Sequence, residues 1–117
     1  MLKQVNRLKK RYQFNYVYKA GSHLSSKHVV IYFTSSKTKD IKVGFAVTKK
    51  IGKAHIRNLI RRRLREIMQK QIPALKQNHN LIVVAKDQIA GATFAELESE
   101  IVSLLVKANL YKDEKNI

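Results

Sequence analysis

The sequence predicts an α+β fold, with helices packed on one β-sheet, and three observations lead to it. Three segments carry apolar side chains at helical spacing, and three others carry the β-branched or alternating residues typical of strands. Their order along the chain is helix, strand, strand, helix, strand, helix. The 117 residues, 44% of them hydrophobic, suffice for one core, so we expect a single domain over residues 1–117.

The first half of the chain is predicted to hold one helix and two strands. The helix covers residues 8–19, and Gly21 follows it as a stop. Residues 28–35 (HVVIYFTS) are rich in β-branched and aromatic side chains, and residues 41–47 (IKVGFAV) alternate between two faces. The polar turn SSKTKD separates these strands, which predicts that they pair as a hairpin.

The second half is predicted to hold a helix, a strand and a last helix. Residues 80–86 (NLIVVAK) form a short apolar run, as in a strand buried on both faces. Thr93 opens the last helix, with Glu96 placed to complete a capping box. The earlier helix, residues 55–71, has one apolar arc that consists of Ile56, Leu59, Ile60, Leu64, Ile67 and Met68.

The positive charge is concentrated in the first half of the chain. Residues 1–65 hold eighteen Lys or Arg and one acidic residue, Asp40, whereas residues 66–117 hold six against seven. These halves contribute +17 and −1 to the net charge of +16. Such an asymmetry is expected if one side of the fold faces a polyanion.

The helix over residues 55–71 and the loop before it carry the densest charge. Arg57, Arg61 and Arg65 recur every four residues, so they form a row at roughly 6 Å spacing, close to that of neighbouring phosphates. An ordinary solvated face mixes signs, yet no acidic residue occurs from residue 41 to residue 65. The candidate polyanion-binding residues are Lys49, Lys50, Lys53, Arg57, Asn58, Arg61, Arg62 and Arg65.

Aromatic residues in the first half indicate a second feature. Basic residues interleaved with aromatic rings are typical of surfaces that stack unpaired bases. Aromatic side chains at helical spacing also pack in cores, so we assign some of these apolar and aromatic residues to the core and the others to the surface. We expect Val17 and Phe33 in the core. We expect Phe14, Tyr18 and Tyr32 on a partly exposed platform.

No motif of a self-sufficient enzyme is present, whether a Walker loop, a dinucleotide fingerprint, a nucleophile elbow or a zincin helix. The four histidines are scattered and cysteine is absent, so no catalytic and no metal-binding residues are predicted. The longest apolar run, residues 81–85, is too short to span a bilayer. We therefore expect a cytoplasmic protein that uses neither a membrane nor a small-molecule substrate.

The segment KKIGKAHIRNLIRRRLRE, residues 49–66, strongly resembles the RNR motif of the bacterial ribonuclease P protein subunit family. The resemblance extends to NRLKKRYQFNYVYKAG near the amino terminus and to NLIVVAK before the last helix. It thus covers nearly the whole chain in the family's order. The chain departs from the motif at Leu59, where the family usually has an arginine.

The resemblance implies a fold like the second domain of ribosomal protein S5, with a left-handed βαβ crossover that carries the RNR helix. It also implies that an RNA subunit holds the active site, uses Mg²⁺ and removes the 5′ leader of precursor tRNA. The eight candidate polyanion-binding residues would then face this RNA subunit. The leader-binding residues implied by the resemblance are Phe14, Tyr18, Tyr32 and Lys86.

Two other classes of protein stay open on composition alone. A non-enzymatic RNA-binding protein of ribosomal type would need the same basic face but no exposed aromatic platform. A DNA-binding architectural protein would bind duplex DNA tightly and leave tRNA processing unaffected.

Overall fold

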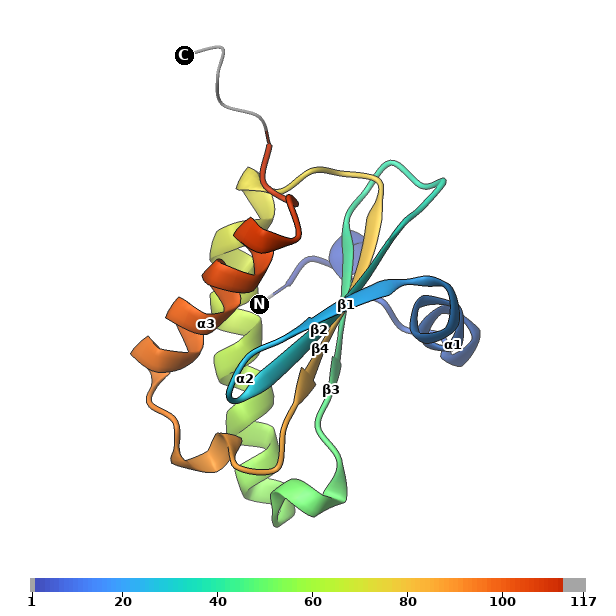
Figure 1. Ribbon diagram of the computed structural model, residues 1–117. Helices are drawn as coiled ribbons and strands as arrows, with labels where there is room; N and C mark the ends of the chain where they lie inside the picture. Colours follow the sequence, from blue (N-terminus) through green and yellow to red (C-terminus); the bar gives the residue numbers. More distant parts are fainter. Residues whose placement is uncertain (1, 113–117) are drawn as a thin grey trace.

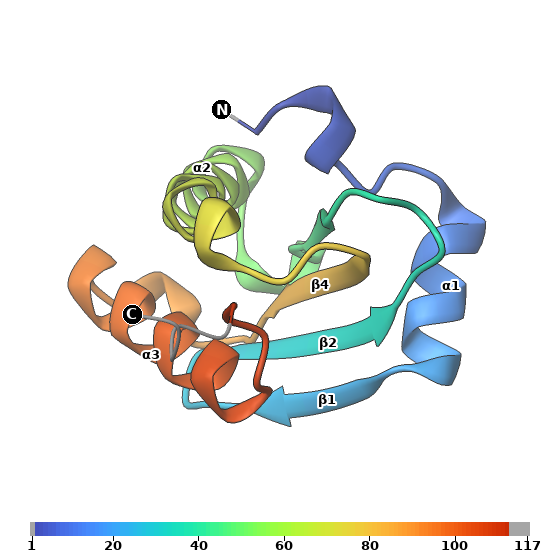
Figure 2. The ribbon, with the colours of Figure 1, turned by 90° about the horizontal axis from the view of Figure 1, so that it is seen from above.

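The computed structural model describes residues 2–112, which form three layers (Figures 1 and 2). Helices α2 (Ala54–Gln71) and α3 (Phe94–Lys107) cover one face of a four-stranded sheet, and α1 (Arg11–Ala20) lies on the other face. The α+β prediction is therefore confirmed. The strands are β1 (Ser22–Ser25), β2 (Val29–Ser35), β3 (Lys42–Ala46) and β4 (His79–Ala85).

The strands lie in the order β1-β2-β4-β3, so the predicted hairpin between β2 and β3 is wrong. Strand β2 is antiparallel to both β1 and β4, whereas β3 is parallel to β4. The apolar β4 takes the centre because it can be buried on both faces. Strand β1 was not predicted, since its sequence SHLS has no apolar alternation.

The chain passes from β3 through α2 to the parallel neighbour β4, which makes a βαβ crossover. Seen from the side of α2 with both strands pointing up, β4 lies to the left of β3 (Figures 1 and 2). The crossover is thus left-handed, as the family resemblance implies and against the general preference for the right hand.

The ends of α1 depend on contacts with the sheet. The helix begins at Arg11, later than predicted, because the backbone N–H of Leu8 donates to the carbonyl of Val43 at 3.1 Å and holds this segment beside β3. The side chain of Gln13 then accepts a hydrogen bond from the N–H of Lys10 at 3.1 Å. Gly21 ends the helix as predicted, and a Cβ there would lie 2.7 Å from the carbonyl oxygen of Phe33.

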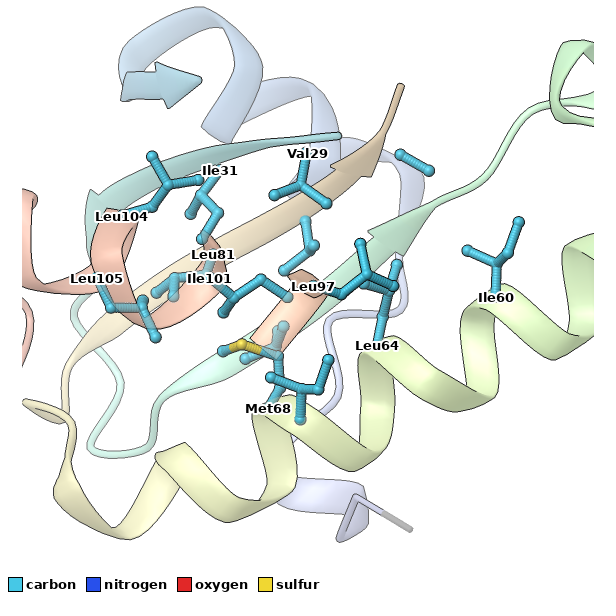
Figure 3. Packing of buried hydrophobic residues seen from close by; sticks show 14 of the residues in the cluster. Val29, Ile31, Ile60, Leu64, Met68, Leu81, Leu97, Ile101, Leu104 and Leu105 are labelled. Atoms are coloured by element: carbon cyan, nitrogen blue, oxygen red, sulfur yellow. The ribbon is translucent and has the colours of Figure 1, made fainter. Parts of the chain in front are cut away.

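The main core lies between the sheet and the α2/α3 layer (Figure 3). The other face has a smaller apolar cluster, in which Val17 of α1 packs against Leu8 and Ile82. Val17 is buried as predicted, and Phe33 packs partly buried against the main core. Leu59, expected on the apolar arc of α2, is instead 39% exposed. The buried residues of α2 are Ile60, Leu64, Ile67 and Met68.

Candidate nucleic-acid interface

Arginine side chains of α2 lie along the sheet edge formed by β3. The guanidinium of Arg57 donates to the carbonyl of Gly52 at 3.1 Å, and that of Arg61 donates to the carbonyl of Val47 at 3.2 Å. Both acceptors belong to the connection between β3 and α2, so both guanidinium groups lie on the same side of the helix. One turn further, Arg65 lines a pocket together with Arg61. The predicted row of arginines therefore forms a continuous, partly buried basic edge.

A short 3₁₀ turn, Lys49–Ile51, connects β3 to α2 and displays lysines. Ile51 is buried and anchors the turn, which leaves Lys49, Lys50 and Lys53 exposed at the start of α2. The first turn of α2 contains no acidic residue, and its N-cap makes no side-chain hydrogen bond. Its free amides and the three lysines give this end of the helix a strongly positive potential.

The outer side of α2 is also basic and polar. Asn58 and Arg62 are exposed, and the side-chain oxygen of Asn58 accepts a hydrogen bond from Arg61 at 3.1 Å. Leu59 interrupts this surface with an exposed apolar side chain. It marks the position at which the chain departs from the RNR motif. Arg63 lies near the apolar arc of α2 and is only partly exposed.

A pocket of about 470 Å³ lies between the amino-terminal segment, β3 and α2. Its lining brings together residues that are far apart in the sequence. Arg7, Lys9 and Phe45 were not among the predicted site residues, although the basic run RLKK before α1 was part of the family resemblance. The charged and aromatic lining residues are Arg7, Lys9, Phe14, Phe45, Arg61 and Arg65, with no acidic residue among them.

Tyr18 and Tyr32 form an aromatic pair between α1 and β2. Their ring centroids are 4.9 Å apart in an edge-to-face arrangement, and His23 stacks on the other side of Tyr32 at 5.1 Å. Tyr18 remains 39% exposed. Partial burial, and then the neighbouring Tyr32, raise the pKa of the Tyr18 hydroxyl, so it stays neutral at physiological pH.

Phe14 packs against the same apolar cluster as Tyr32, on the face of the sheet that α1 covers, but over a different strand. Its ring packs directly over Gly44 of β3. Gly44 and Tyr32 are both in register with Ile82 on the intervening β4, so they are two strand spacings apart, about 10 Å. Phe14 thus lies at the β3 side of this face, where it also lines the pocket, while Tyr18 and Tyr32 lie at the β2 side.

A row of apolar side chains lies on the same face of the sheet as the tyrosine pair. Val30, Val84 and Ala46 lie in register across β2, β4 and β3, on the same face as α1, and all three are only half-buried. Lys86 follows at the end of β4, where its ammonium donates to the carbonyl of Ser26. The tyrosine pair, this row and Lys86 together define the open sheet face.

Residues 2–112 contain neither a cluster of metal-binding side chains nor a membrane-spanning helix. No group of three or more His, Cys, Asp or Glu side chains gathers there as it would around a metal ion. In the same residues, no helix is both long and apolar enough to cross a membrane.

A strongly basic α+β protein with an arginine edge free of acidic residues has the surface of a nucleic-acid-binding protein. The family model for ribonuclease P matches residues 2–109. The chain therefore belongs to the ribonuclease P protein family, as the RNR resemblance indicated, and is a protein component of that endoribonuclease. This assignment decides against the ribosomal and DNA-binding alternatives.

Individual relatives agree with the family assignment. The ribonuclease P protein component of Alkaliphilus oremlandii is 37% identical over 109 residues, which covers 93% of this chain and 96% of that protein. The solved RNase P protein of Staphylococcus aureus has a TM-score of 0.85 at 26% identity, covering 92% of this chain and 98% of that one. The Thermotoga maritima protein, with a TM-score of 0.79 at 24% identity, covers 86% of this chain and 96% of that one and supports the fold.

Proposed function

We propose that the chain binds the RNA subunit of ribonuclease P through the basic edge of α2 and its preceding lysine turn. The observation that carries this proposal is the row of Arg57, Arg61 and Arg65 on one side of α2, in a stretch without any acidic residue. Guanidinium groups at this spacing can each bind a phosphate of a folded RNA backbone. Their mutual repulsion is relieved only when such an anion is bound.

The open sheet face is the surface that we propose for the 5′ leader of precursor tRNA. A single strand has bases free to stack, and Tyr18 and Tyr32 offer partly exposed rings beside an apolar row. Lys86 gives one N–H to Ser26 and keeps two donors for a phosphate. Phe14, implied by the resemblance as a leader contact, packs against the same apolar cluster as Tyr32 and belongs to the same proposed surface.

In this proposal the chain supplies binding and orientation, while the hydrolysis of precursor tRNA occurs in the RNA subunit in the cytoplasm. Mg²⁺ would act in that RNA subunit. The basic residues of the chain would screen the repulsion between the RNA subunit and its RNA substrate. The need for Mg²⁺ as a screening ion should therefore decrease when the chain is present.

Cleavage of a precursor tRNA by bacterial ribonuclease P RNA at low Mg²⁺ tests the proposed function. We expect the chain to stimulate cleavage by the RNA and to cleave nothing alone. Activity of the protein without RNA would contradict the proposal, and so would a folded protein that gives no stimulation.

Leader binding is tested separately with Tyr18→Leu and Tyr32→Leu. Each variant should weaken binding of precursor tRNA to the holoenzyme by roughly tenfold, the size of one lost stack, and leave mature tRNA unaffected. Tyr12→Leu is the matched control, because Tyr12 is on the same helix and 67% exposed but lies outside the open sheet face. Equal losses for precursor and mature tRNA would show that the two tyrosines do not contact the leader.

A further inference from the structure

A glutamate of α3 fixes the turn between β1 and β2. The Glu100 carboxylate accepts hydrogen bonds from the Ser26 hydroxyl at 2.6 Å and from the His28 backbone N–H at 2.8 Å, and it lies 2.5 Å from Nδ1 of the His28 ring. His28 is buried, and the Glu100 side chain is only 18% exposed. Polar groups withdrawn from water are costly to leave unpaired, so these three contacts hold the turn firmly against α3.

The same two residues of the turn hold Lys86 at the end of β4. The backbone carbonyl of His28 accepts a hydrogen bond from the Lys86 N–H at 2.9 Å, and the carbonyl of Ser26 accepts one from the Lys86 ammonium. The residues that hold Lys86 are therefore the residues that Glu100 holds. No ion pair joins Glu100 to Lys86 in residues 2–112, so the two side chains are linked by contact only through the turn.

The Lys86 ammonium remains able to bind an anion. It lines a pocket of about 430 Å³ together with Lys27, Asp87 and Gln88, and in the described residues no carboxylate lies within ion-pair distance of either lysine. One of its three N–H groups donates to Ser26, which leaves two for a phosphate. Asp87 repels an anion on its own side of the pocket, so the position of the ammonium decides whether a phosphate is bound. A lysine that is already held also loses less rotamer entropy on binding than a free one.

We propose that Glu100 is a positioning residue, which fixes the turn between β1 and β2 so that the turn holds the Lys86 ammonium in place for a phosphate of the precursor tRNA leader. The inference rests on the proposed function, because Lys86 belongs to the open sheet face. Glu100 itself would contact no RNA. Helix α3 would thus contribute to leader binding although it covers the opposite face of the sheet from α1 (Figure 2).

Glu100→Gln tests this role in the holoenzyme, because it removes the carboxylate and keeps the shape of the side chain. We expect precursor tRNA to bind roughly two- to tenfold more weakly, the effect of ordering one flexible side chain, with the affinities for mature tRNA and for the RNA subunit unchanged. The substitution also removes a negative charge, which through the overall field alone would strengthen RNA binding. Glu98→Gln is the matched control, because it removes the same charge from a 35% exposed side chain of the same helix and should not weaken precursor binding.

Variants of Lys86 and Ser26 distinguish positioning from a general loss of stability. Lys86→Ala should weaken precursor binding by itself, and Glu100→Gln should add no further loss in that background, because no ammonium remains to be held. Ser26→Ala removes one of the hydrogen bonds to Glu100 without changing any charge, and it should weaken precursor binding in the same direction but by less.

The positioning role and the proposed function fail in different ways. Unchanged or stronger precursor binding in Glu100→Gln would overturn the positioning role, and so would equal losses with and without Lys86 or equal losses for precursor and mature tRNA. A loss of precursor binding in Lys86→Ala would in each of these cases still support leader binding at the open sheet face. Unchanged precursor binding in Lys86→Ala would overturn both the leader contact of Lys86 and the positioning role of Glu100.

Discussion

Glu100 of α3 holds the turn between β1 and β2 against the helix. Its carboxylate accepts hydrogen bonds from the Ser26 hydroxyl at 2.6 Å and the His28 backbone N–H at 2.8 Å, and it pairs with the His28 ring at 2.5 Å. Partial burial acts to raise the pKa of Glu100, but the hydrogen bonds from Ser26 and His28 outweigh it and hold this pKa below its usual value of 4.5. The carboxylate is therefore stabilised in its charged form.

The lowered pKa of Glu100 predicts an acid-dependent loss of stability. A carboxyl group whose pKa is lower in the folded state stabilises the fold above its unfolded pKa, and this contribution is lost as the pH falls through the folded pKa. The free energy of unfolding should thus decrease as the pH is lowered below about 4.5. Glu100→Gln should remove this part of the pH dependence and cost about 1 to 2 kcal/mol at pH 7, measured by urea unfolding.

Glu98→Gln is the matched control for Glu100→Gln on the same helix. Glu98 is 3.8 Å from Lys70, and the side chains are 35% and 63% exposed, so this solvent-screened pair should contribute little. If Glu100→Gln kept the acid dependence of the wild type, the contacts of Glu100 would not be its source.

Gly44 illustrates how one residue can position another. A Cβ at Gly44 would lie 2.3 Å from the tip of the Phe14 ring, which would have to move. Gly44→Ala should therefore lower the free energy of unfolding by about 1 to 3 kcal/mol. Thermal unfolding measures this loss.

Two further variants separate this mechanism from a general effect of alanine at a glycine. Gly91→Ala should be nearly neutral, because nothing lies within 4 Å of a Cβ added there. In a Phe14→Leu background the cost of Gly44→Ala should shrink, since the obstructing ring is gone. Additive costs of the two substitutions would show that the Phe14 ring is not the obstacle.

At the scale of elements, α3 shows a local signal that specifies a helix start. Thr93 accepts a hydrogen bond from the N–H of Glu96 at 3.1 Å, and the Glu96 carboxylate accepts one from the N–H of Thr93 at 2.8 Å. Thr93→Ala should cost about 1 kcal/mol of stability, measured by chemical unfolding. Ser99→Ala, at an exposed position within α3, should cost less, and an equal loss for both would mean that the cap contributes nothing.

The capping box was predictable because its signal is local, whereas the pairing of strands is not. The alternation in residues 41–47 correctly placed Val43 toward the core and Gly44 on the opposite face. It contained no information about which strand lies beside β3, and β4 comes between β3 and β2 only after α2 has crossed the sheet. A hairpin inferred from nearness in sequence fails for this reason.

The parts of the candidate site also differ in whether they depend on local sequence or on contacts between distant segments. The four-residue spacing of Arg57, Arg61 and Arg65 was enough to predict their common side of α2, because helix geometry fixes it. The pocket needs the amino-terminal segment folded back along β3, where Leu8 bonds to Val43. Nothing in the run RLKK specifies that contact, so the participation of Arg7 could only be seen in the structure.

At the scale of the whole molecule, a net charge of +16 makes affinity for any RNA strongly dependent on salt. The position of each charge decides how much it contributes to this salt dependence. Phosphates in direct contact release their counterions, whereas distant charges act through a field that salt screens within about 10 Å at 0.1 M. Removing charges from the basic edge of α2 should therefore change the salt dependence more than removing the same number elsewhere.

Arg61→Ala combined with Arg65→Ala should weaken RNA-subunit binding and flatten its salt dependence, because two phosphate contacts are lost. Each contact contributes roughly 0.7 to 0.9 to the slope of log K against log salt, so the slope should decrease by about 1.5. Lys37→Ala with Lys39→Ala removes the same charge from the exposed loop between β2 and β3 and should change the slope far less. If the two double variants changed the slope equally, the basic edge would act only through the overall field and not through direct contacts with RNA phosphates.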